Sequence, residues 1–498
     1  MAHRVIEIDN KAKGFYVTTP IYYVNDKPHI GHAYTTIAAD IVARWHRLKG
    51  QRVFFLTGTD EHGEKIAKAA AASGSNPQEF VDGIVKQYKD AWEVLNISYD
   101  YFVRTTDKKH IEAVSKFLDI LAKNGDVYKG EYEGWYCVSD ETFFTDLQLK
   151  DGKCPECGKE VIRLKESTHF FRLSAYQDKL LDLYKTNTEF LSPKLRSEEI
   201  INRVKEGLKD ISITRATVKW GVQFDNDHTV YVWVDALLNY ISALDWPNGD
   251  KFGDFWPANV HIVGKEINWF HSVIWPAMLL SAGMNTPEKV FAHGWWTVDG
   301  KKMSKSSHNF VDPLDITKRY SVDALRYFLI RQMPFGYDGD FSESAMKELI
   351  NSELLGALGN LVNRVLTLAE NSKMSKFTGE NELEAKINLT VLEGHMDAIE
   401  LYSALNEIME FVRYCNKYVN DKKPWALEGK ELEEVLYNLL ESLRVISILL
   451  YPFIPATCEK IAQSLGTDKE LSMSLINCKF RNEFGDKTSK GDLLFKKV

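Results

Sequence analysis

Residues 15–32 read FYVTTPIYYVNDKPHIGH, and this stretch decides the fold of the chain. Residues 15–18 are aromatic and β-branched, which predicts a buried strand. A loop with Asn and Pro follows, and a helix is expected over residues 31–48, where Gly50 ends it. A second strand is expected over residues 53–56, with an Ala-rich helix after it. This order of strands and helices indicates a parallel sheet with right-handed crossover connections.

The composition is that of an ordinary globular protein. The chain has 498 residues, of which 27% are charged, and a formal net charge of -8. At roughly 150 residues per domain this length suggests about three domains. The acidic balance argues against a protein that coats nucleic acid non-specifically, although it permits a local basic face.

The sequence also indicates where the protein works. No apolar run reaches the roughly 18 residues of a membrane helix, and residues 1–14 lack the apolar core of a secretory signal. Six cysteines in a chain of this length do not make a disulfide scaffold and favour a reducing compartment. We therefore expect a cytoplasmic protein with no membrane association.

The chain changes character along its length, which predicts its domains. Residues 126–225 contain cysteines, turns and aromatic segments, as in a domain inserted between two halves of a sheet domain, residues 1–125 and 226–343. Apolar runs predict three strands in the second half, at residues 230–234, 260–263 and 290–293. Over residues 344–498 apolar side chains recur every three or four positions, which predicts an all-α helix bundle.

Two short motifs carry the chemistry. The first is Pro28-His29-Ile30-Gly31-His32, between the first strand and the first helix. His29 and His32 share a face of the first helical turn, where free N–H groups and the helix dipole favour phosphate. Neutral or charged imidazoles can donate hydrogen bonds to such a group.

The second motif is Lys301-Lys302-Met303-Ser304-Lys305-Ser306-Ser307. Lys302 and Lys305 are placed to clamp a polyphosphate as charge develops in a transition state. Taken alone, the segment is more typical of a solvated surface loop.

Together, an HIGH motif and a KMSKS motif about 270 positions later resemble the paired signature of class I aminoacyl-tRNA synthetases. Four further stretches resemble the methionyl-tRNA synthetase family: TTPIYYVN at 18–25, TGTDEHG at 57–63, VWVDA at 232–236 and GKEINWFH at 264–271. The resemblance implies a Rossmann-type (HUP-like) α/β catalytic domain with an inserted connective domain, followed by a helical anticodon-binding domain. It also implies a methionine–tRNA ligase, which forms methionyl-adenylate from methionine and ATP, releases pyrophosphate, and charges the 3′-terminal adenosine of tRNA(Met).

The resemblance further implies roles for individual residues. The methionine site would comprise Ile21, Tyr23, Asp60, Trp233, Tyr240 and His271. Asp60 would hold the ammonium group, and the aromatic and aliphatic side chains suit an apolar thioether. The ATP site would comprise His29, Gly31, His32, Gly264, Glu266, Lys302 and Lys305. Of these, Glu266 would accept from the ribose hydroxyls, and His29, His32, Lys302 and Lys305 would be the catalytic residues. Mg²⁺ is expected as part of the ATP complex.

The helical region contains the expected anticodon site, formed by Asn360, Arg364 and Trp425. Asn360 and Arg364 are four residues apart and so share a helix face. Trp425 follows a Lys-Lys-Pro turn and is expected to be an exposed platform on which an unpaired base stacks.

A third motif, Cys154-Pro155-Glu156-Cys157-Gly158, is the turn of a zinc knuckle. Its expected partner is Cys137, but Asp140 stands where zinc-binding members of the family have a fourth cysteine. Because three thiolates and one carboxylate are an uncommon structural set, both a zinc site and a relic knuckle of free thiols remain open.

Three other functions are alternatives to a methionine–tRNA ligase. Another class I aminoacyl-tRNA synthetase is one, although an insertion of about a hundred residues is short for the editing domain of branched-chain enzymes. The others are a small-molecule nucleotidyltransferase, which would lack the helical domain, and an inactive tRNA-binding homologue, which would not need both motifs. The chain ends soon after the helical region, so a monomer is expected.

Overall fold

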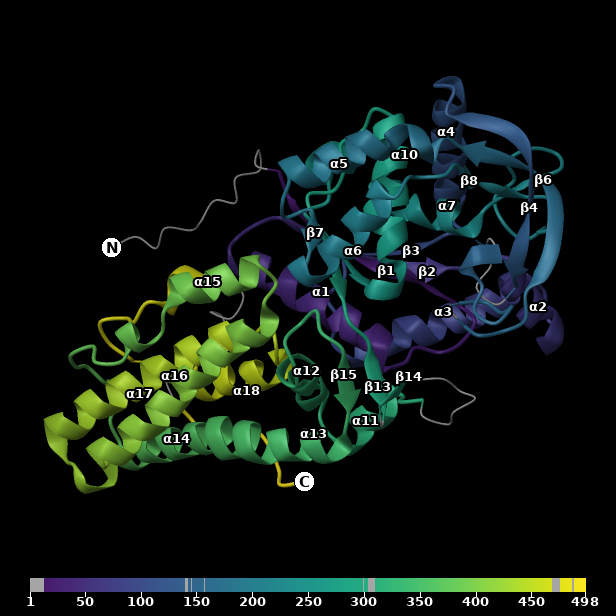
Figure 1. Cartoon of the computed structure of the whole chain (residues 1–498). Helices are drawn as coiled ribbons and strands as arrows, with labels where there is room; N and C mark the ends of the chain where they lie inside the picture. The colour runs from purple at the N-terminus through teal and green to yellow at the C-terminus, as the bar shows by residue number, and fades with distance from the viewer. Residues whose placement is uncertain are drawn as a thin grey trace.

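The computed structural model describes residues 13–138, 142–144, 146–155, 157–298, 300–302, 310–467, 475–485 and 488–498. A sheet domain and a helical domain lie side by side (Figure 1). The sheet has six parallel strands in the order β3-β2-β1-β11-β12-β7. The strands are β1 (Phe15–Tyr23), β2 (Val53–Asp60), β3 (Tyr101–Arg104), β7 (Leu191–Ser192), β11 (Val260–Gly264) and β12 (Val290–His293). The predicted Rossmann-type sheet is therefore confirmed.

The central strands are buried because helices cover both faces of the sheet. In β2 every residue after Val53 is buried, as expected of a strand in the interior of a parallel sheet. β1 continues past Pro20, where its register with β2 shifts between Thr18 and Ile21. Helices between and around the strands are α1 (Ile30–Leu48), α2 (Glu64–Ser73), α3 (Pro77–Val94), α4 (Lys108–Lys123) and α10 (Trp275–Ser281).

The centre of the sheet is where its strand order changes direction. β1 pairs with β2 on one side and with β11 on the other. From β1 the chain continues to β2 and β3 on one side of the sheet. From β11 it continues to β12 on the other side. In sheets of this kind the carboxyl ends of these central strands border a crevice that binds ligands.

One predicted strand is wrong. Of residues 230–234, only the first belongs to a strand, β10 (Thr229–Val230), which pairs antiparallel with β9 (Thr214–Arg215). The rest enter helix α7 (Val232–Leu237), in which the N–H groups of Val234 and Asp235 bond to the carbonyl of Tyr231. Short apolar runs are alike in buried strands and buried helices, so their periodicity does not separate the two.

The predicted insertion is a separate antiparallel sheet with the order β5-β4-β6-β8. Its strands are β4 (Val127–Cys137), β5 (Thr142–Phe144), β6 (Ile162–Phe171) and β8 (Ile211–Ser212). α5 (Gln177–Thr186) and α6 (Lys194–Lys205) connect it back toward β7 and the parallel sheet.

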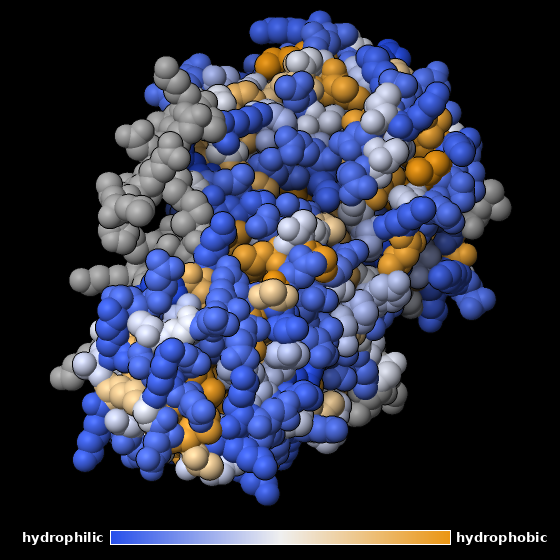
Figure 2. Space-filling view, turned by 90° about the vertical axis from the view of Figure 1, so that its left-hand side faces the viewer, coloured by the Kyte–Doolittle hydropathy of each residue, from blue (hydrophilic) through white to orange (hydrophobic). Residues whose placement is uncertain are grey.

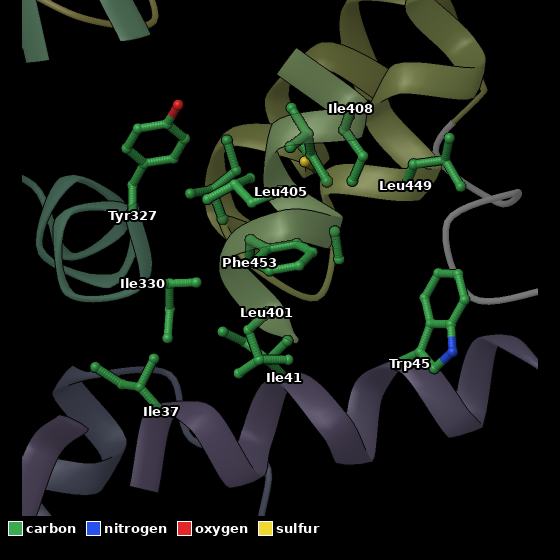
Figure 3. Packing of buried hydrophobic residues seen from close by; sticks show 14 of the residues in the cluster. Ile37, Ile41, Trp45, Tyr327, Ile330, Leu401, Leu405, Ile408, Leu449 and Phe453 are labelled. Carbon is green, nitrogen blue, oxygen red and sulfur yellow. The ribbon is translucent and has the colours of Figure 1, made fainter. Parts of the chain in front are cut away.

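The C-terminal part is helical and shares a core with the sheet domain. Its main helices are α13 (Glu343–Leu349), α14 (Asn360–Ser372), α15 (Leu389–Asp397), α16 (Leu401–Lys422), α17 (Gly429–Leu450) and α18 (Pro455–Leu465). Between the domains lie β13 (Trp296–Val298), β14 (Lys301–Lys302), β15 (Gly339–Phe341), α11 (Pro313–Arg319) and α12 (Val322–Arg331). Figure 3 shows Ile37, Ile41 and Trp45 of α1 in one cluster with side chains of α12, α16 and α17. None of the described helices is long and apolar enough to cross a membrane.

Candidate active site

A cavity of about 560 Å³ opens at the carboxyl ends of the central strands. Its lining includes all six residues predicted to bind methionine: Ile21, Tyr23, Asp60, Trp233, Tyr240 and His271. Glu266, predicted to contact the ribose, lies on the same wall, whereas His29, Gly31, His32 and Gly264 do not line this cavity. The fold thus gathers the predicted methionine residues, and the predicted phosphate residues lie outside this space.

His29 and His32 cap the N-terminus of α1 reciprocally. Nδ1 of His29 accepts hydrogen bonds from the backbone N–H of Gly31 at 3.0 Å and of His32 at 3.4 Å. Nδ1 of His32 accepts from the backbone N–H of His29 at 3.3 Å, and the two rings stack with centroids 3.7 Å apart. Because Nδ1 is an acceptor in both rings, Nε2–H is the donor that each ring has left for a ligand.

Both imidazoles are neutral near neutral pH. Burial lowers the pKa of His29 to about 4, against a smaller opposite effect of Glu266. Burial, and then the neighbouring His29, lower the pKa of His32 well below its usual value. Of the two protonation states allowed by the sequence, the structure therefore selects the neutral one.

The residues that follow the KMSKS motif meet the HIGH motif. The ring of Phe310 lies 6.0 Å from the ring of His29, edge to face. The carbonyl of Val311 accepts from the backbone N–H of Ile30 at 3.1 Å. The segment after the KMSKS motif therefore contacts the HIGH motif, although about 270 positions separate the two motifs.

An ion pair fixes this approach. Lys27 Nζ lies 2.6 Å from Asp312 Oδ2, and the other oxygen of Asp312 accepts from the N–H of Leu314 to cap α11. On the other side of the motif, β14 pairs antiparallel with β13. Lys305 and the side chain of Lys302 lie outside the described residues.

The polar end of the cavity is a hydrogen-bonded pair. Nδ1 of His271 donates to the carbonyl of Ile267 at 2.9 Å, so its Nε2 accepts from the Tyr240 hydroxyl at 2.7 Å. Burial lowers the pKa of His271 to about 4 and raises that of Tyr240. Both groups are therefore neutral. The Tyr240 hydroxyl donates its proton to His271, so its oxygen can act only as an acceptor toward a ligand.

Apolar and acidic walls complete the cavity. The rings of Trp233 and Phe270 stack with centroids 4.0 Å apart. Asp60 is buried at the end of β2, where it pairs in register with Tyr23. The arrangement combines a flat aromatic surface with a buried carboxylate, which suits a small ligand that has both an apolar part and an ammonium group.

Glu266 lies directly after β11 in a position that Gly264 makes available. Its Oε2 accepts from Trp295 Nε1 at 2.5 Å. A Cβ added at Gly264 would lie 2.5 Å from both carboxylate oxygens of Glu266, so a side chain there would displace the carboxylate.

Comparison with known proteins identifies this arrangement. The sequence profile described as "tRNA synthetases class I (M)" matches residues 15–166 and 160–366. The methionine–tRNA ligase of Caldanaerobacter subterraneus subsp. tengcongensis is 49% identical, over 98% of this chain and 79% of the relative. The chain belongs to the methionyl-tRNA synthetase family. Its activity is that of a methionine–tRNA ligase.

Further relatives agree with this membership. The enzyme of Thermotoga maritima is 46% identical over 97% of this chain and 80% of its own length. The structure of Mycobacterium tuberculosis methionyl-tRNA synthetase in complex with methionyl-adenylate has a TM-score of 0.93 at 40% identity, and covers 97% of this chain and 100% of that one. A profile described as "Anticodon-binding domain of tRNA ligase" matches residues 383–493.

Within this synthetase, one buried cluster was missed by the sequence analysis. Asp235 of α7 faces Nδ1 of His62 at 2.6 Å and Nε2 of His110 at 2.9 Å. Burial alone would raise the pKa of Asp235, but the two imidazoles lower it to about 2. The cluster anchors the helix that bears Trp233. His62 and Asp235 lie in stretches quoted for the family resemblance, whereas no sequence signal pointed to His110.

The three predicted zinc cysteines converge in the structure. The ligand atoms of Cys137, Cys154 and Cys157 lie within 4.8 Å of one another, and the Sγ atoms of Cys137 and Cys157 are 3.5 Å apart. Gly158 closes the turn with φ +69, a conformation that favours glycine, and its N–H bonds to the Cys154 carbonyl. Three convergent thiols fit a zinc ion. Asp140 lies outside the described residues.

The predicted anticodon residues lie in the helical domain, away from the sheet (Figure 1). Trp425 is 58% exposed, in the 3-10 turn Pro424–Ala426. The Arg364 guanidinium lies 5.7 Å from the centre of the Trp425 ring, and its Nη2 donates to Asn420 Oδ1 at 3.0 Å. Asn360 is exposed at the start of α14. The structure thus places Arg364 and Trp425 side by side.

Proposed function

We propose that this ligase binds methionine in the cavity at the carboxyl ends of β1, β2 and β11. The observation that carries the proposal is the convergence there of Ile21, Tyr23, Asp60, Trp233, Tyr240 and His271. The Asp60 carboxylate holds the ammonium group. Trp233 and Ile21 exclude water from the thioether, and the Tyr240 hydroxyl, held by His271, makes a weak polar contact with the sulfur.

ATP binds beside this cavity, at the N-terminus of α1. His29 and His32 donate from Nε2 to the phosphates, and the neutral state of both rings keeps them donors without adding positive charge. Gly31 lets the nucleotide approach the backbone, and Glu266, next to Gly264, accepts from the ribose hydroxyls. Mg²⁺ arrives with ATP and is held mainly by the phosphate oxygens.

Adenylate formation then needs positioning rather than a protein nucleophile. The methionine carboxylate attacks the α-phosphorus in line, the bond to the β-phosphate oxygen breaks, and pyrophosphate leaves. Lys302 and Lys305 stabilise the charge that develops on the leaving group. The contacts of Phe310, Val311 and Asp312 with the start of α1 hold the segment after these lysines next to His29.

The remaining sites serve tRNA and structure. Asn360, Arg364 and Trp425 contact the anticodon of tRNA(Met), with Trp425 as a stacking platform. Cys137, Cys154 and Cys157 hold a zinc ion, which when bound cross-links the knuckle; Cys157 also lines the methionine cavity, so the knuckle shapes its rim.

The enzyme acts as a cytoplasmic monomer. None of the six cysteines, all of which lie among the described residues, forms a disulfide, which suits a reducing compartment. The face in Figure 2 is mostly hydrophilic, with apolar side chains in separate groups.

ATP–pyrophosphate exchange tests the active-site assignment. We expect exchange to require methionine and not to occur with leucine, isoleucine, valine or cysteine. Lys305→Ala should lower exchange at least about 100-fold while methionine affinity changes less than twofold, because the ammonium acts on the transition state. Lys318→Ala, an exposed lysine paired with Asp315, is the matched control. Equal loss of methionine binding in Lys305→Ala would contradict the assigned role.

A further inference from the structure

A second group of potential metal ligands lies on the inserted sheet, apart from the cysteines. Among the described residues, two clusters of His, Cys, Asp or Glu place at least three ligand atoms within 4.8 Å of one another. One is the cysteine knuckle, and the other is His169, Asp225 and His228. His169 is in β6, and the other two belong to the turn that leads into β10.

His228 is oriented as a metal-bound imidazole is. It is buried, and its Nε2 lies 3.1 Å from the carbonyl of Ser167, which can only accept, so Nε2 is the protonated nitrogen. Its Nδ1 then faces the carboxylate of Asp225 at 2.8 Å and 3.1 Å. The two groups form a hydrogen-bonded pair there, and a divalent ion bound by both would take the place of the proton that they share.

Hydrogen bonds from the backbone also fix the carboxylate of Asp225. Its Oδ1 accepts hydrogen bonds from the backbone N–H groups of Asp227 at 2.9 Å and of His228 at 2.8 Å. Its Oδ2 lies 3.8 Å from Nε2 of His169. The Thr214 hydroxyl, 3.4 Å from Nδ1 of His169, can accept that nitrogen's proton and leave Nε2 as a donor of electrons.

We propose that His169, Asp225 and His228 form a second metal site, for a divalent transition ion of the zinc class. Two imidazoles and one carboxylate are borderline ligands that suit Zn²⁺, Co²⁺ or Ni²⁺ rather than Mg²⁺ or Ca²⁺. The Asp225 side chain is 39% exposed, so the ion has access from solvent and keeps water in its remaining position.

The site joins β6 to a segment that reaches the methionine cavity. His228 precedes β10, and two residues after β10 the chain enters α7, which bears Trp233. The turn itself is short, because the N–H groups of Phe224 and Asp225 both bond to the His228 carbonyl. A bound ion therefore ties the start of this segment to β6 and limits its movement.

Metal titration separates this site from the knuckle. In a full-length Cys154→Ser, Cys157→Ser variant, stripped with a chelator, we expect Zn²⁺ to bind with one equivalent per chain by calorimetry. Co²⁺ in the same variant should give the weak bands of nitrogen and oxygen ligands without thiolate charge-transfer absorption. Asp225→Asn and His169→Gln should each weaken Zn²⁺ binding at least about tenfold.

Two matched variants control for effects on the turn and on surface histidines. Asp227→Asn changes the same turn outside the ligand set, and His395→Gln removes a partly exposed histidine paired with Glu400. Both should bind Zn²⁺ as the parent does. Asp225→Asn alters an accessible side chain and should fold even if a histidine variant does not. Absence of saturable Zn²⁺ binding in the Cys154→Ser, Cys157→Ser parent, or equal binding in Asp225→Asn and Asp227→Asn, would overturn the proposal.

Discussion

At the scale of single residues, environment decides what each histidine can do. Thirteen histidines occur in the chain, and their sequence neighbours do not reveal their protonation states. His29 and His32 are neutral because the fold buries them at the end of α1. His271 is neutral because burial lowers its pKa. Its hydrogen bond to the Ile267 carbonyl uses Nδ1, so Nε2 is the nitrogen that faces Tyr240.

Buried histidines should make stability depend on pH. Burial lowers the pKa of His46 to about 4 from 6.5, so between these values the unfolded chain binds the extra proton. Its contribution is fully present above pH 6.5 and is lost as the pH falls toward 4. His46→Gln should therefore reduce the slope of unfolding free energy against pH, by at most about 1.4 kcal/mol per pH unit in this window.

Urea unfolding at a series of pH values checks this expectation. His395→Gln, at a partly exposed histidine paired with Glu400, serves as the comparison. An unchanged slope in His46→Gln would contradict the assigned protonation state.

The Tyr240 hydroxyl should matter for methionine. Tyr240→Phe leaves the Nε2 atom of His271 buried without its donor, which costs about 1–3 kcal/mol. We expect the Kd for methionine to rise about 5- to 100-fold, measured by equilibrium binding, with little change in the Kd for ATP. Tyr337→Phe, at a 55% exposed tyrosine, should change neither.

At the scale of elements, α1 links the active site to the helical domain. Its first turn bears the HIGH motif, and further along, Asp40 is buried between Arg44 and Arg326. Burial alone would raise the pKa of Asp40, but the two guanidinium groups and the Ser98 hydrogen bonds lower it to about 2. Arg326 of α12 also donates to the carbonyls of Pro452 and Phe453, so one side chain joins the HIGH helix to the helical domain.

Removing Arg326 should therefore destabilise the whole molecule. Arg326→Ala removes the donor to the carbonyls of Pro452 and Phe453 and leaves the Asp40 carboxylate with one guanidinium partner, Arg44. We expect a loss of about 3–5 kcal/mol. The measurement is the midpoint of urea unfolding. Lys86→Ala, which removes an exposed pair with Asp90, should stay within about 0.5 kcal/mol of the parent. A loss below about 1 kcal/mol in Arg326→Ala would contradict a structural role for this network.

At the scale of the whole molecule, one continuous core links two sites that lie far apart. Cluster residues extend from α1 through α12 to α16 and α17, as Figure 3 shows. The proposed methionine cavity lies at the carboxyl ends of the central strands, and Trp425 lies in the turn between α16 and α17 of the helical domain. In the proposed function, activation of methionine and selection of tRNA therefore use separate surfaces of one molecule.

This separation predicts a selective effect of Trp425→Ala. Methionine-dependent pyrophosphate exchange should remain within twofold, because no cavity residue changes. Charging of tRNA should lose roughly 10- to 100-fold in kcat/KM, since base stacking on an aromatic ring contributes about 1–3 kcal/mol. Val94→Ala, at an exposed position on α3, is the control. Unchanged charging would reject Trp425 as an anticodon contact.

The sequence by itself determined the class of the fold and the motifs, because local periodicity and spacing specify strands, helices and the turns between them. It predicted the strand, helix and motif order of residues 15–60, the helical C-terminal part, and the cysteine turn. It did not separate a strand from a helix at residues 230–234, because short apolar runs are alike in both. Only the tertiary structure decided that His110 lies against Asp235, that His29 and His32 are neutral, and that His169 meets Asp225 and His228. These facts depend on burial and on contacts between distant segments, which local sequence does not specify.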